Sequence, residues 1–225
     1  GWLGKENVAP RVILTEGGSM TDIYVYNQLT KDNNGNIKVD QNGNLGITSS
    51  NTPVKVGNLD ADFNLGWTNH FTYKGIDLGV VLSARVGGLA YSATQGILDY
   101  YGVSETSATA RDNGGIPINN GKVNAQMYYQ TIGTGEGGYG RYYLYSATNV
   151  RLQELSLNYT LPKRWFKNVA NVTLGIVGRN LWMIYCKAPF DPELSASTSS
   201  NYYMNVDYFM QPSLRNFGFN VKVQF

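Results

Sequence analysis

The chain has 225 residues and a formal net charge of +2 at pH 7, which argues against a nucleic-acid partner. Its single cysteine, Cys186, excludes an internal disulfide bond. Charged residues make up only 15% of the chain, against about 25% in an average soluble protein, whereas Gly (26) and Tyr (17) are abundant. This composition is typical of a large β-sheet whose apolar face meets lipid, with Tyr side chains at the level of the headgroups.

The chain shows neither a transmembrane helix nor a signal peptide. It has no run of about 18 apolar residues, the minimum for a helix that spans a bilayer. Its first residues, from Gly1 to Lys5, do not form the apolar core of a signal peptide. Because a protein with a lipid-facing sheet needs such a signal, we expect this sequence to be the C-terminal piece of a longer polypeptide.

The N-terminal quarter is predicted to hold two short strands, at residues 11–15 and 22–26. A long loop at residues 31–61 follows, rich in Asn, Asp and Gly, with one small hairpin within it as the alternative. Within this loop Asp40, Asn42 and Asn44 have the spacing of a calcium-binding loop. The sixth and twelfth positions of such a loop should be Gly and Glu, but they are Leu45 and Asn51 here. A turn built from Asn and Gly is therefore the preferred interpretation, and calcium is the weaker alternative.

A β-hairpin is predicted next. Apolar and polar residues alternate along Phe63–Tyr73, where only Asn69 interrupts the apolar face, and again along Ile76–Val86. Lys74 and Gly75 form the tight turn between them. Both strands are longer than the usual 5–6 residues or so. Residues 87–141 are predicted to be a long loop with one helical turn near residues 97–101.

Three more strands are predicted in the last third of the chain, within residues 142–161, 169–185 and 215–225. The turn at residues 162–168 is basic and aromatic, with Lys163, Arg164 and Lys167 beside Trp165, and it suits either phosphate headgroups or an ordinary soluble turn. Residues 186–214 are predicted to be another long loop. The last strand alternates strictly, and its apolar face consists of Phe217, Phe219, Val221, Val223 and Phe225.

The five strands share one arrangement of connections. The short turns and the C-terminus fall on one edge of the sheet, and the long loops fall on the other, as in outer-membrane barrels with short periplasmic turns and long extracellular loops. The alternation alone also fits a soluble sheet with one buried face. Five strands cannot close a membrane barrel, whose minimum is about eight, and an open edge in lipid would leave backbone groups unpaired. We therefore expect other strands of the same polypeptide to complete the barrel.

Several segments of the sequence resemble the late barrel of SusC-like TonB-dependent transporters, the glycan and peptide importers of Bacteroidetes. The order and spacing of these segments match, and they extend through nearly the whole chain. The segments are Gly17-Gly18-Ser19-Met20-Thr21-Asp22-Ile23-Tyr24, residues 71–78, residues 149–162, Gly178-Arg179-Asn180-Leu181-Trp182 and Asp191-Pro192-Glu193. Residues 31–61 depart from the Asp-rich loop that this family often has at the corresponding place.

The resemblance implies an all-β fold, namely the C-terminal strands of an antiparallel transmembrane barrel of about 22 strands with a plugged lumen. All 225 residues would belong to this barrel portion, and the plug and TonB box would precede Gly1. The implied partners are the remainder of the barrel polypeptide, a SusD-like lipoprotein, TonB and outer-membrane lipid. The implied function is active import of oligosaccharides or peptides. A passive porin or a surface-exposed binding or structural β-barrel protein is the alternative.

The candidate site residues form three groups. The apolar face of the last strand is the predicted signal for barrel assembly. Residues predicted to face the lumen, as ligand contacts, plug contacts or ordinary hydrated side chains, are His70, Arg85, Glu154 and Arg179. Loop residues predicted to contact substrate or the lipoprotein, or else only to pack within the loop, are Tyr100, Tyr101, Tyr139, Tyr142 and Tyr143. We expect no enzyme, because no acid/base pair, nucleophile-base pair or metal cluster has suitable spacing.

Overall fold

The computed structural model describes residues 10–133, 139–167, 169–194 and 205–224. They form two compact units. The sheet unit comprises Ala61–Gly87, Ala147–Asp191 and Gln211–Phe225, and the helical unit comprises Gly1–Asp60, Gly88–Ser146 and Pro192–Met210. Among the described residues, none of the helices has the length and apolarity that crossing a membrane requires.

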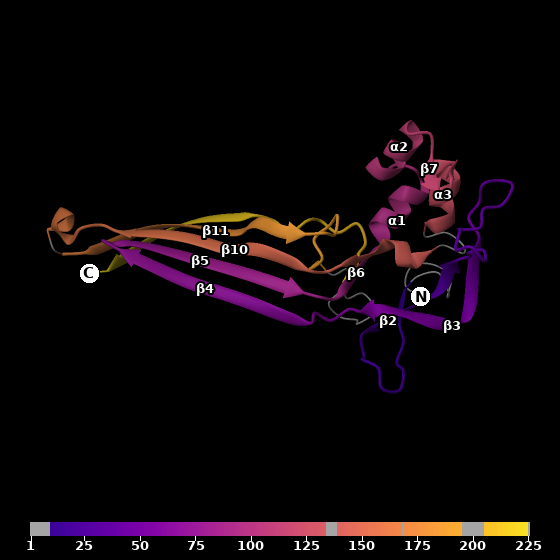
Figure 1. The fold of residues 1–225 in the computed structure, drawn as a ribbon. Helices are drawn as coiled ribbons and strands as arrows, with labels where there is room; N and C mark the ends of the chain where they lie inside the picture. The colour runs from indigo at the N-terminus through magenta and orange to yellow at the C-terminus, as the bar shows by residue number, and fades with distance from the viewer. Residues whose placement is uncertain (1–9, 134–138, 168, 195–204, 225) are drawn as a thin grey trace. The chain divides into compact units, whose positions relative to one another are not determined.

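The sheet unit is one antiparallel sheet of five long strands with the order β13-β11-β10-β5-β4 (Figure 1). These are the five strands that the alternation predicts. Their bounds are β4 Phe63–Tyr73, β5 Ile76–Val86, β10 Asn149–Thr160, β11 Asn171–Cys186 and β13 Asn216–Gln224. The β4–β5 turn places both Lys74 and Gly75 at positive φ (46° and 85°), as a two-residue hairpin turn requires.

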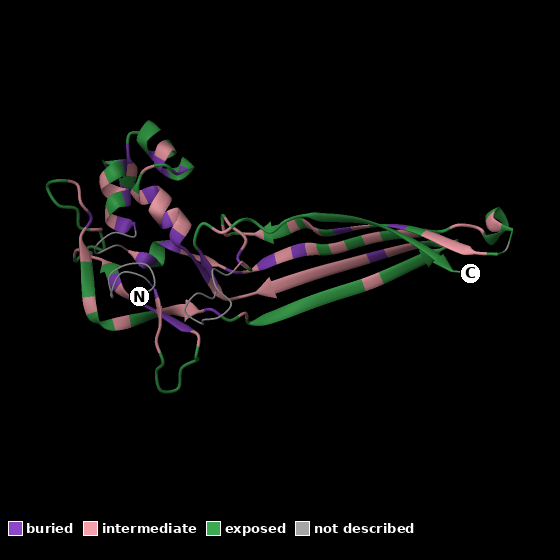
Figure 2. Ribbon diagram, turned by 180° about the vertical axis from the view of Figure 1, so that it is seen from behind, coloured by how far each residue is buried: buried purple, intermediate pink, exposed green. Residues whose placement is uncertain are grey.

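One face of this sheet is apolar along every strand. The register aligns Phe71, Leu78, Leu157, Ile176 and Phe219 in a single row across all five strands. Phe71, Ile176 and Phe219 are 52%, 56% and 69% exposed, although a soluble sheet would bury such a row. Figure 2 shows the exposed class along β4 and β13 and the alternation of classes along β10 and β11.

Near the middle of β10 and β11, two irregularities of the backbone keep the apolar side chains on one face of the sheet. Between Leu152 and Glu154 the register shifts against both neighbouring strands. Gln153 is an extra residue of β10 against β5, whereas against β11 the extra residue lies in β11, between Arg179 and Trp182. In β11, Asn180 has a positive φ of 54°. Such bulges re-aim side chains. Here Leu152 and Leu155 both stay in register with the apolar face.

The helical unit begins with a three-stranded sheet of β1 (Arg11–Val12), β2 (Asp22–Leu29) and β3 (Ile47–Asn58). The prediction that residues 31–61 form one long loop is wrong for β3, which pairs with β2. The polar composition of β3 concealed the strand. Its backbone pairs with that of the more apolar β2, whose first four residues are buried, in an antiparallel ladder of hydrogen bonds.

The prediction of a long loop at residues 87–141 is also wrong. This segment contains β6 (Leu89–Ser92), α1 (Ala93–Tyr100), α2 (Glu105–Asp112), β7 (Ile116–Ile118), β8 (Gly121–Val123) and α3 (Ala125–Ile132), and the chain continues into η1 (Gly140–Tyr143) and β9 (Leu144–Ser146). Each α-helix starts at a side-chain N-cap, and the caps are Ser92, Ser104 and Asn124. The predicted helical turn near residues 97–101 is confirmed as part of the longer helix α1, which contains residues 97–100.

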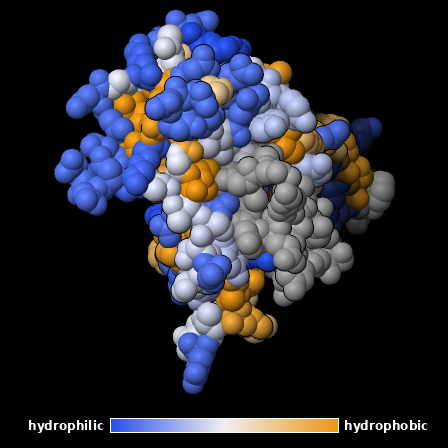
Figure 3. All heavy atoms as spheres, turned by 90° about the vertical axis from the view of Figure 1, so that its right-hand side faces the viewer, coloured by the Kyte–Doolittle hydropathy of each residue, from blue (hydrophilic) through white to orange (hydrophobic). Residues whose placement is uncertain are grey.

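A hydrophobic core holds these short elements together. It contains Tyr91, Ala110, Ile132, Tyr143 and Val206, among others. The last of these belongs to β12 (Val206–Asp207), which pairs in parallel with β6 and completes a β12-β6-β9 sheet. On the side of the helical unit shown in Figure 3, hydrophilic residues predominate and hydrophobic residues form only small groups.

Candidate functional site on the polar face of the sheet

The face opposite the apolar rows is mainly polar on all five strands, and Val81 and Val177 are its apolar exceptions in the middle of the sheet. One row contains Thr72, Asp77, Asn158, Gly175 and Asn220. The Thr72 hydroxyl donates to Asp77 Oδ2 at 2.9 Å. A Cβ on Gly175 would lie 2.1 Å from Asn158 Oδ1 and 2.6 Å from Asn220 Nδ2. Glycine at this position therefore lets the two amides lie over the strand.

The four residues predicted to face the lumen all lie on this polar face, at different heights. His70 Nδ1 lies 3.8 Å from Asp77 Oδ1. Arg85 lies opposite Asn64 on one side and Asn149 on the other. Arg179 Nε donates to Glu154 Oε2 at 2.8 Å. Because the Arg179 side chain is 67% exposed, solvent screens this ion pair, which leaves both groups available to a ligand.

An open pocket of about 750 Å³ lies on the polar face around this pair. Its walls come from β10, β11 and the segment that leads into β13. The lining residues are Arg151, Gln153, Glu154, Arg179, Asn180, Gln211, Pro212, Ser213, Leu214 and Asn216. They offer hydrogen-bond donors, acceptors and both signs of charge, which suits a polar ligand of mixed character.

A second ion pair fixes one wall of the pocket. Arg151 Nη2 lies 2.7 Å from Asp191 Oδ1, and both side chains are buried (5% and 8% exposed). Arg151 also donates to Asn180 Oδ1 at 3.1 Å, and the Ser213 hydroxyl donates to Asp191 Oδ2 at 2.5 Å. Three of the segments that carry the family resemblance thus meet in one network. Their joint role could not be predicted from the sequence, because no local pattern links positions 40 residues apart.

The Gly17–Tyr24 segment is a tight turn that leads into β2 at Asp22. The Asp22 carboxylate accepts from the Ser19 N–H at 3.1 Å and from Lys55 Nζ at 2.6 Å. The Lys55 hydrogen bond lowers the pKa of Asp22. A Cβ on Gly18 would lie 2.5 Å from Thr15 Oγ1, so the turn needs glycine there.

The calcium candidate loop proves to be the second of two equivalent turns. Asp40 Oδ1 accepts from the N–H groups of Asn42 and Asn44, both at 2.8 Å, and Asp40 Oδ2 accepts from Asn44 Nδ2 at 2.9 Å. Hydrogen bonds from Asn44 lower the pKa of Asp40. Asp32 repeats the pattern with Asn34 and Asn36. The repeat of Asp-x-Asn-Gly-Asn at residues 32–36 and 40–44 was visible in the sequence and was missed.

The carboxylate oxygens of both turns are thus engaged by protein donors. Among the described residues, no group of three or more His, Cys, Asp or Glu side chains is placed to hold a metal ion.

The candidate loop tyrosines belong to the helical unit and differ in exposure. Tyr101 is 73% exposed and Tyr142 is 41% exposed, whereas Tyr143 is fully buried in the core. Tyr100 packs edge-to-face on Tyr101, with 5.2 Å between ring centroids, and Tyr139 packs against the core. Tyr101 and Tyr142 therefore offer the accessible rings. The Tyr143 ring serves the packing of the core.

The predicted assembly strand is β13. Its apolar residues Phe217, Phe219, Val221 and Val223 are all exposed and face the same side as the other apolar rows. Phe225 lies outside the described residues. The geometry thus gives β13 the two-faced pattern that the sequence predicts for it.

Comparison with known proteins adds three findings, and no protein-family model matches the chain. A TonB-dependent receptor P3 of Formosa agariphila is 26% identical over 200 residues, which cover 86% of this chain and 19% of that protein. The structure of the RagAB peptide importer in the closed-closed state matches with a TM-score of 0.53 and 17% identity, over 90% of this chain and 22% of that chain. The structure of the RagAB peptide transporter matches with a TM-score of 0.52.

The chain thus spans about a fifth of the length of each relative that it matches. At this level of identity the structural matches report on the fold. They confirm the predicted fold class, a piece of a large antiparallel transmembrane barrel in which the five strands do not close on themselves.

Proposed function

We propose that this chain is part of a SusC-like TonB-dependent transporter of the bacterial outer membrane and that its sheet is one wall of an active import path for oligosaccharides or peptides. The observation that carries the proposal is the two-faced sheet. Its apolar face suits lipid, and its polar face holds an open pocket around Glu154 and Arg179. In this assignment the pocket lies along the path of the substrate.

We further propose that the whole transporter works with a SusD-like surface lipoprotein and takes its energy from TonB. Support comes from the names of its relatives, a TonB-dependent receptor and a peptide importer. The exposed rings of Tyr101 and Tyr142 in the helical unit are candidate contacts for substrate or for this lipoprotein.

The pocket favours peptides as the substrate class. An exposed arginine and a carboxylate 2.8 Å apart, beside amides such as Gln153 and Gln211, complement the two charged termini and the backbone of a short peptide. Oligosaccharides would use the same amides through their hydroxyl groups and make less use of the charges.

Uptake by cells that carry the full-length transporter tests this proposal. Labelled short peptides and labelled oligosaccharides are supplied to the wild type, to Arg179→Gln and to Lys222→Gln, with and without TonB. Lys222 is the matched control, because it lies on the polar face but not in the pocket. We expect TonB-dependent uptake that falls severalfold in Arg179→Gln and is unchanged in Lys222→Gln.

Uptake that continues without TonB would instead support the passive porin. Binding of the ligand at the cell surface with no uptake in any strain would support a binding or structural β-barrel protein.

A further inference from the structure

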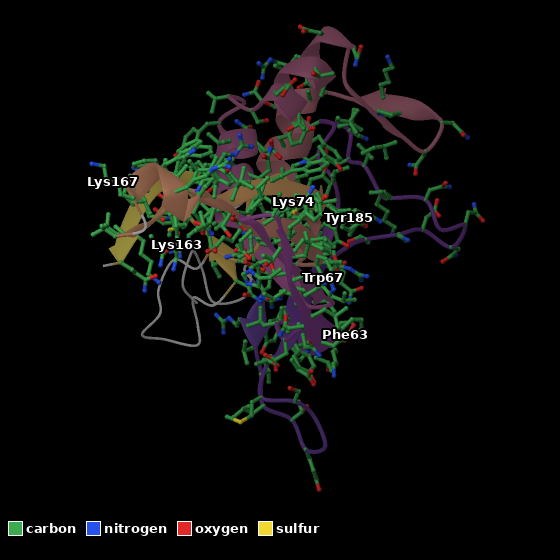
Figure 4. All side chains as sticks on the ribbon, turned by 90° about the vertical axis from the view of Figure 1, so that its left-hand side faces the viewer. Phe63, Trp67, Lys74, Lys163, Lys167 and Tyr185 are labelled. Atoms are coloured by element: carbon green, nitrogen blue, oxygen red, sulfur yellow. The ribbon has the colours of Figure 1, made fainter. Side chains whose placement is uncertain are left out.

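Four cationic side chains lie along the turn edge of the sheet, where the short connections are: Lys74, Lys163, Arg164 and Lys167. Lys74 belongs to the β4–β5 turn, and the other three belong to the β10–β11 connection around η2 (Lys163–Phe166). The two connections are neighbours, because the Thr160 N–H donates to the Gly75 carbonyl at 2.7 Å. Figure 4 looks onto this edge and labels the three lysines.

The cations are not neutralised locally. All four are exposed, and residues 73–76 and 160–171 contain no Asp or Glu. The first acidic residue after this turn in β5, Asp77, points to the polar face, where it accepts a hydrogen bond from Thr72 and lies near His70. The two connections therefore carry four positively charged side chains and no negatively charged one.

Large apolar side chains accompany these charges. Trp165 and Val169 are 63% and 67% exposed in the same connection. Tyr73 ends the apolar face of β4 at this edge and is 68% exposed, and Lys74 Nζ lies 5.1 Å from the centre of its ring. In water such rings would be an uncovered apolar patch, whereas at a bilayer surface they lie at headgroup level, with cations reaching outward past them.

Turn conformations and backbone hydrogen bonds shape the described residues of this edge. Lys74 and Lys167 both adopt left-handed conformations, with φ of 46° and 52°. The Trp165 N–H donates to the Pro162 carbonyl, and the Val169 N–H donates to the Phe166 carbonyl, both at 3.0 Å. Four cations beside a lipid-facing surface can donate hydrogen bonds to several phosphate oxygens.

We propose that this turn edge binds the phosphate headgroups of anionic phospholipids in the periplasmic leaflet of the outer membrane. A lipid with a net negative charge fits better than a zwitterionic one, because the ammonium group of phosphatidylethanolamine would lie among the lysines. The proposal rests on the membrane location of the sheet and does not depend on what the transporter imports.

Native mass spectrometry of the full-length transporter tests the proposal. The protein is released from nanodiscs of phosphatidylethanolamine and phosphatidylglycerol, and the amounts of the two lipids that stay bound to it are compared. The test variant combines Lys74→Gln, Lys163→Gln, Arg164→Gln and Lys167→Gln. Lys222→Gln is the control, because Lys222 lies near the same edge on the polar face.

The wild type and the control should retain phosphatidylglycerol in preference to phosphatidylethanolamine. In the fourfold variant, which carries all four substitutions, the ratio of bound phosphatidylglycerol to bound phosphatidylethanolamine should fall by about tenfold or more. A variant in which all three lysines become arginine should keep the preference, which separates loss of charge from loss of fold. Three results would overturn the proposal: an unchanged preference in the fourfold variant, an equal loss in Lys222→Gln, or equal competition by inorganic phosphate. If the fourfold variant keeps its lipid preference but binds TonB less well, the edge is a protein contact.

Discussion

Two arginine–carboxylate pairs of the sheet unit have the same chemistry but differ in burial. Arg151 and Asp191 are almost completely withdrawn from solvent, and Asn180 and Ser213 supply additional hydrogen bonds. The Arg179 side chain is 67% exposed and the Glu154 side chain is 29% exposed, so this pair stays in contact with water. A buried charge that loses its partner keeps its desolvation cost, whereas an exposed charge is rehydrated.

Asp191→Ala should therefore lower the free energy of unfolding of the full-length barrel by about 3–5 kcal/mol, because it leaves the Arg151 guanidinium buried without its counterion. The matched variant Glu154→Ala should change it by about 1 kcal/mol or less. Urea titration followed by tryptophan fluorescence measures both. Equal effects of the two variants would contradict this assignment of burial.

Glycine is needed at position 175 on the polar face, because the Asn158 and Asn220 side chains lie over this residue. Gly175→Ala would place a Cβ against Asn158 and Asn220, and we expect a loss of about 1–3 kcal/mol in the free energy of unfolding. Gly66→Ala is the control, since no described atom outside its chain neighbours lies within 4 Å of that Cβ. The same titration tests this pair, and Gly175→Ala with Asn158→Gly should recover part of the loss.

At the scale of elements, the long strands were predictable because each repeats a period of two over nine or more residues. The helices were not, because each α-helix has only eight residues, too few for a clear period of 3.6. Their stability comes from a core that also includes Leu45 and Val206, residues distant in sequence. The three N-caps, Ser92, Ser104 and Asn124, were the available signal.

The network of Arg151, Asn180 and Asp191 could not be derived from spacing for a similar reason. A bulge in β11 and the loop that follows it bring these residues together, and neither feature has a sequence period. Sequence analysis did place His70, Arg85, Glu154 and Arg179 on one face, because alternation alone determines that.

The two faces of β13 provide a prediction for a single element. Phe219→Lys should destabilise the barrel by about 2–4 kcal/mol, because it puts a charge on the lipid face. Asn220→Lys, one residue further, should have little effect, because Asn220 lies on the polar face. Yield of folded barrel in outer-membrane fractions measures both. Deletion of β13 or Phe225→Ala should also reduce this yield, and normal yield would contradict the assembly role of the strand.

Two tyrosines in and against the core of the helical unit, Tyr129 and Tyr145, predict a response of this unit to alkaline pH. Burial raises the pKa of Tyr129 and of Tyr145 from 10.0 to about 12. A raised pKa in the folded state means that the stabilisation is complete below pH 10 and is lost as the pH rises from 10 to about 12. Limited proteolysis within residues 93–132 should therefore accelerate over that interval, and Tyr129→Phe should weaken the acceleration. Proteolysis that is independent of pH would contradict the burial of these hydroxyl groups.

At the scale of the whole molecule, we propose a different role for each of the two units. The sheet unit supplies a lipid face and a polar wall, and the helical unit supplies a folded insertion with accessible rings. The chain spans about a fifth of each relative that it matches, so the plug, the TonB contact and the lipoprotein belong to the proposal for the full-length transporter.

Depth-dependent quenching tests the central claim, that the apolar face of the sheet meets lipid and the polar face meets water. In full-length transporter with Cys186→Ala, single cysteines replace Phe217, Gly218, Phe219, Asn220 and Val221 in turn and carry an environment-sensitive fluorophore. We predict that labels at 217, 219 and 221 are quenched by spin-labelled lipid and that labels at 218 and 220 are quenched only by a water-soluble agent. Quenching by the water-soluble agent at all five positions, or the reverse alternation, would contradict the membrane assignment of this sheet.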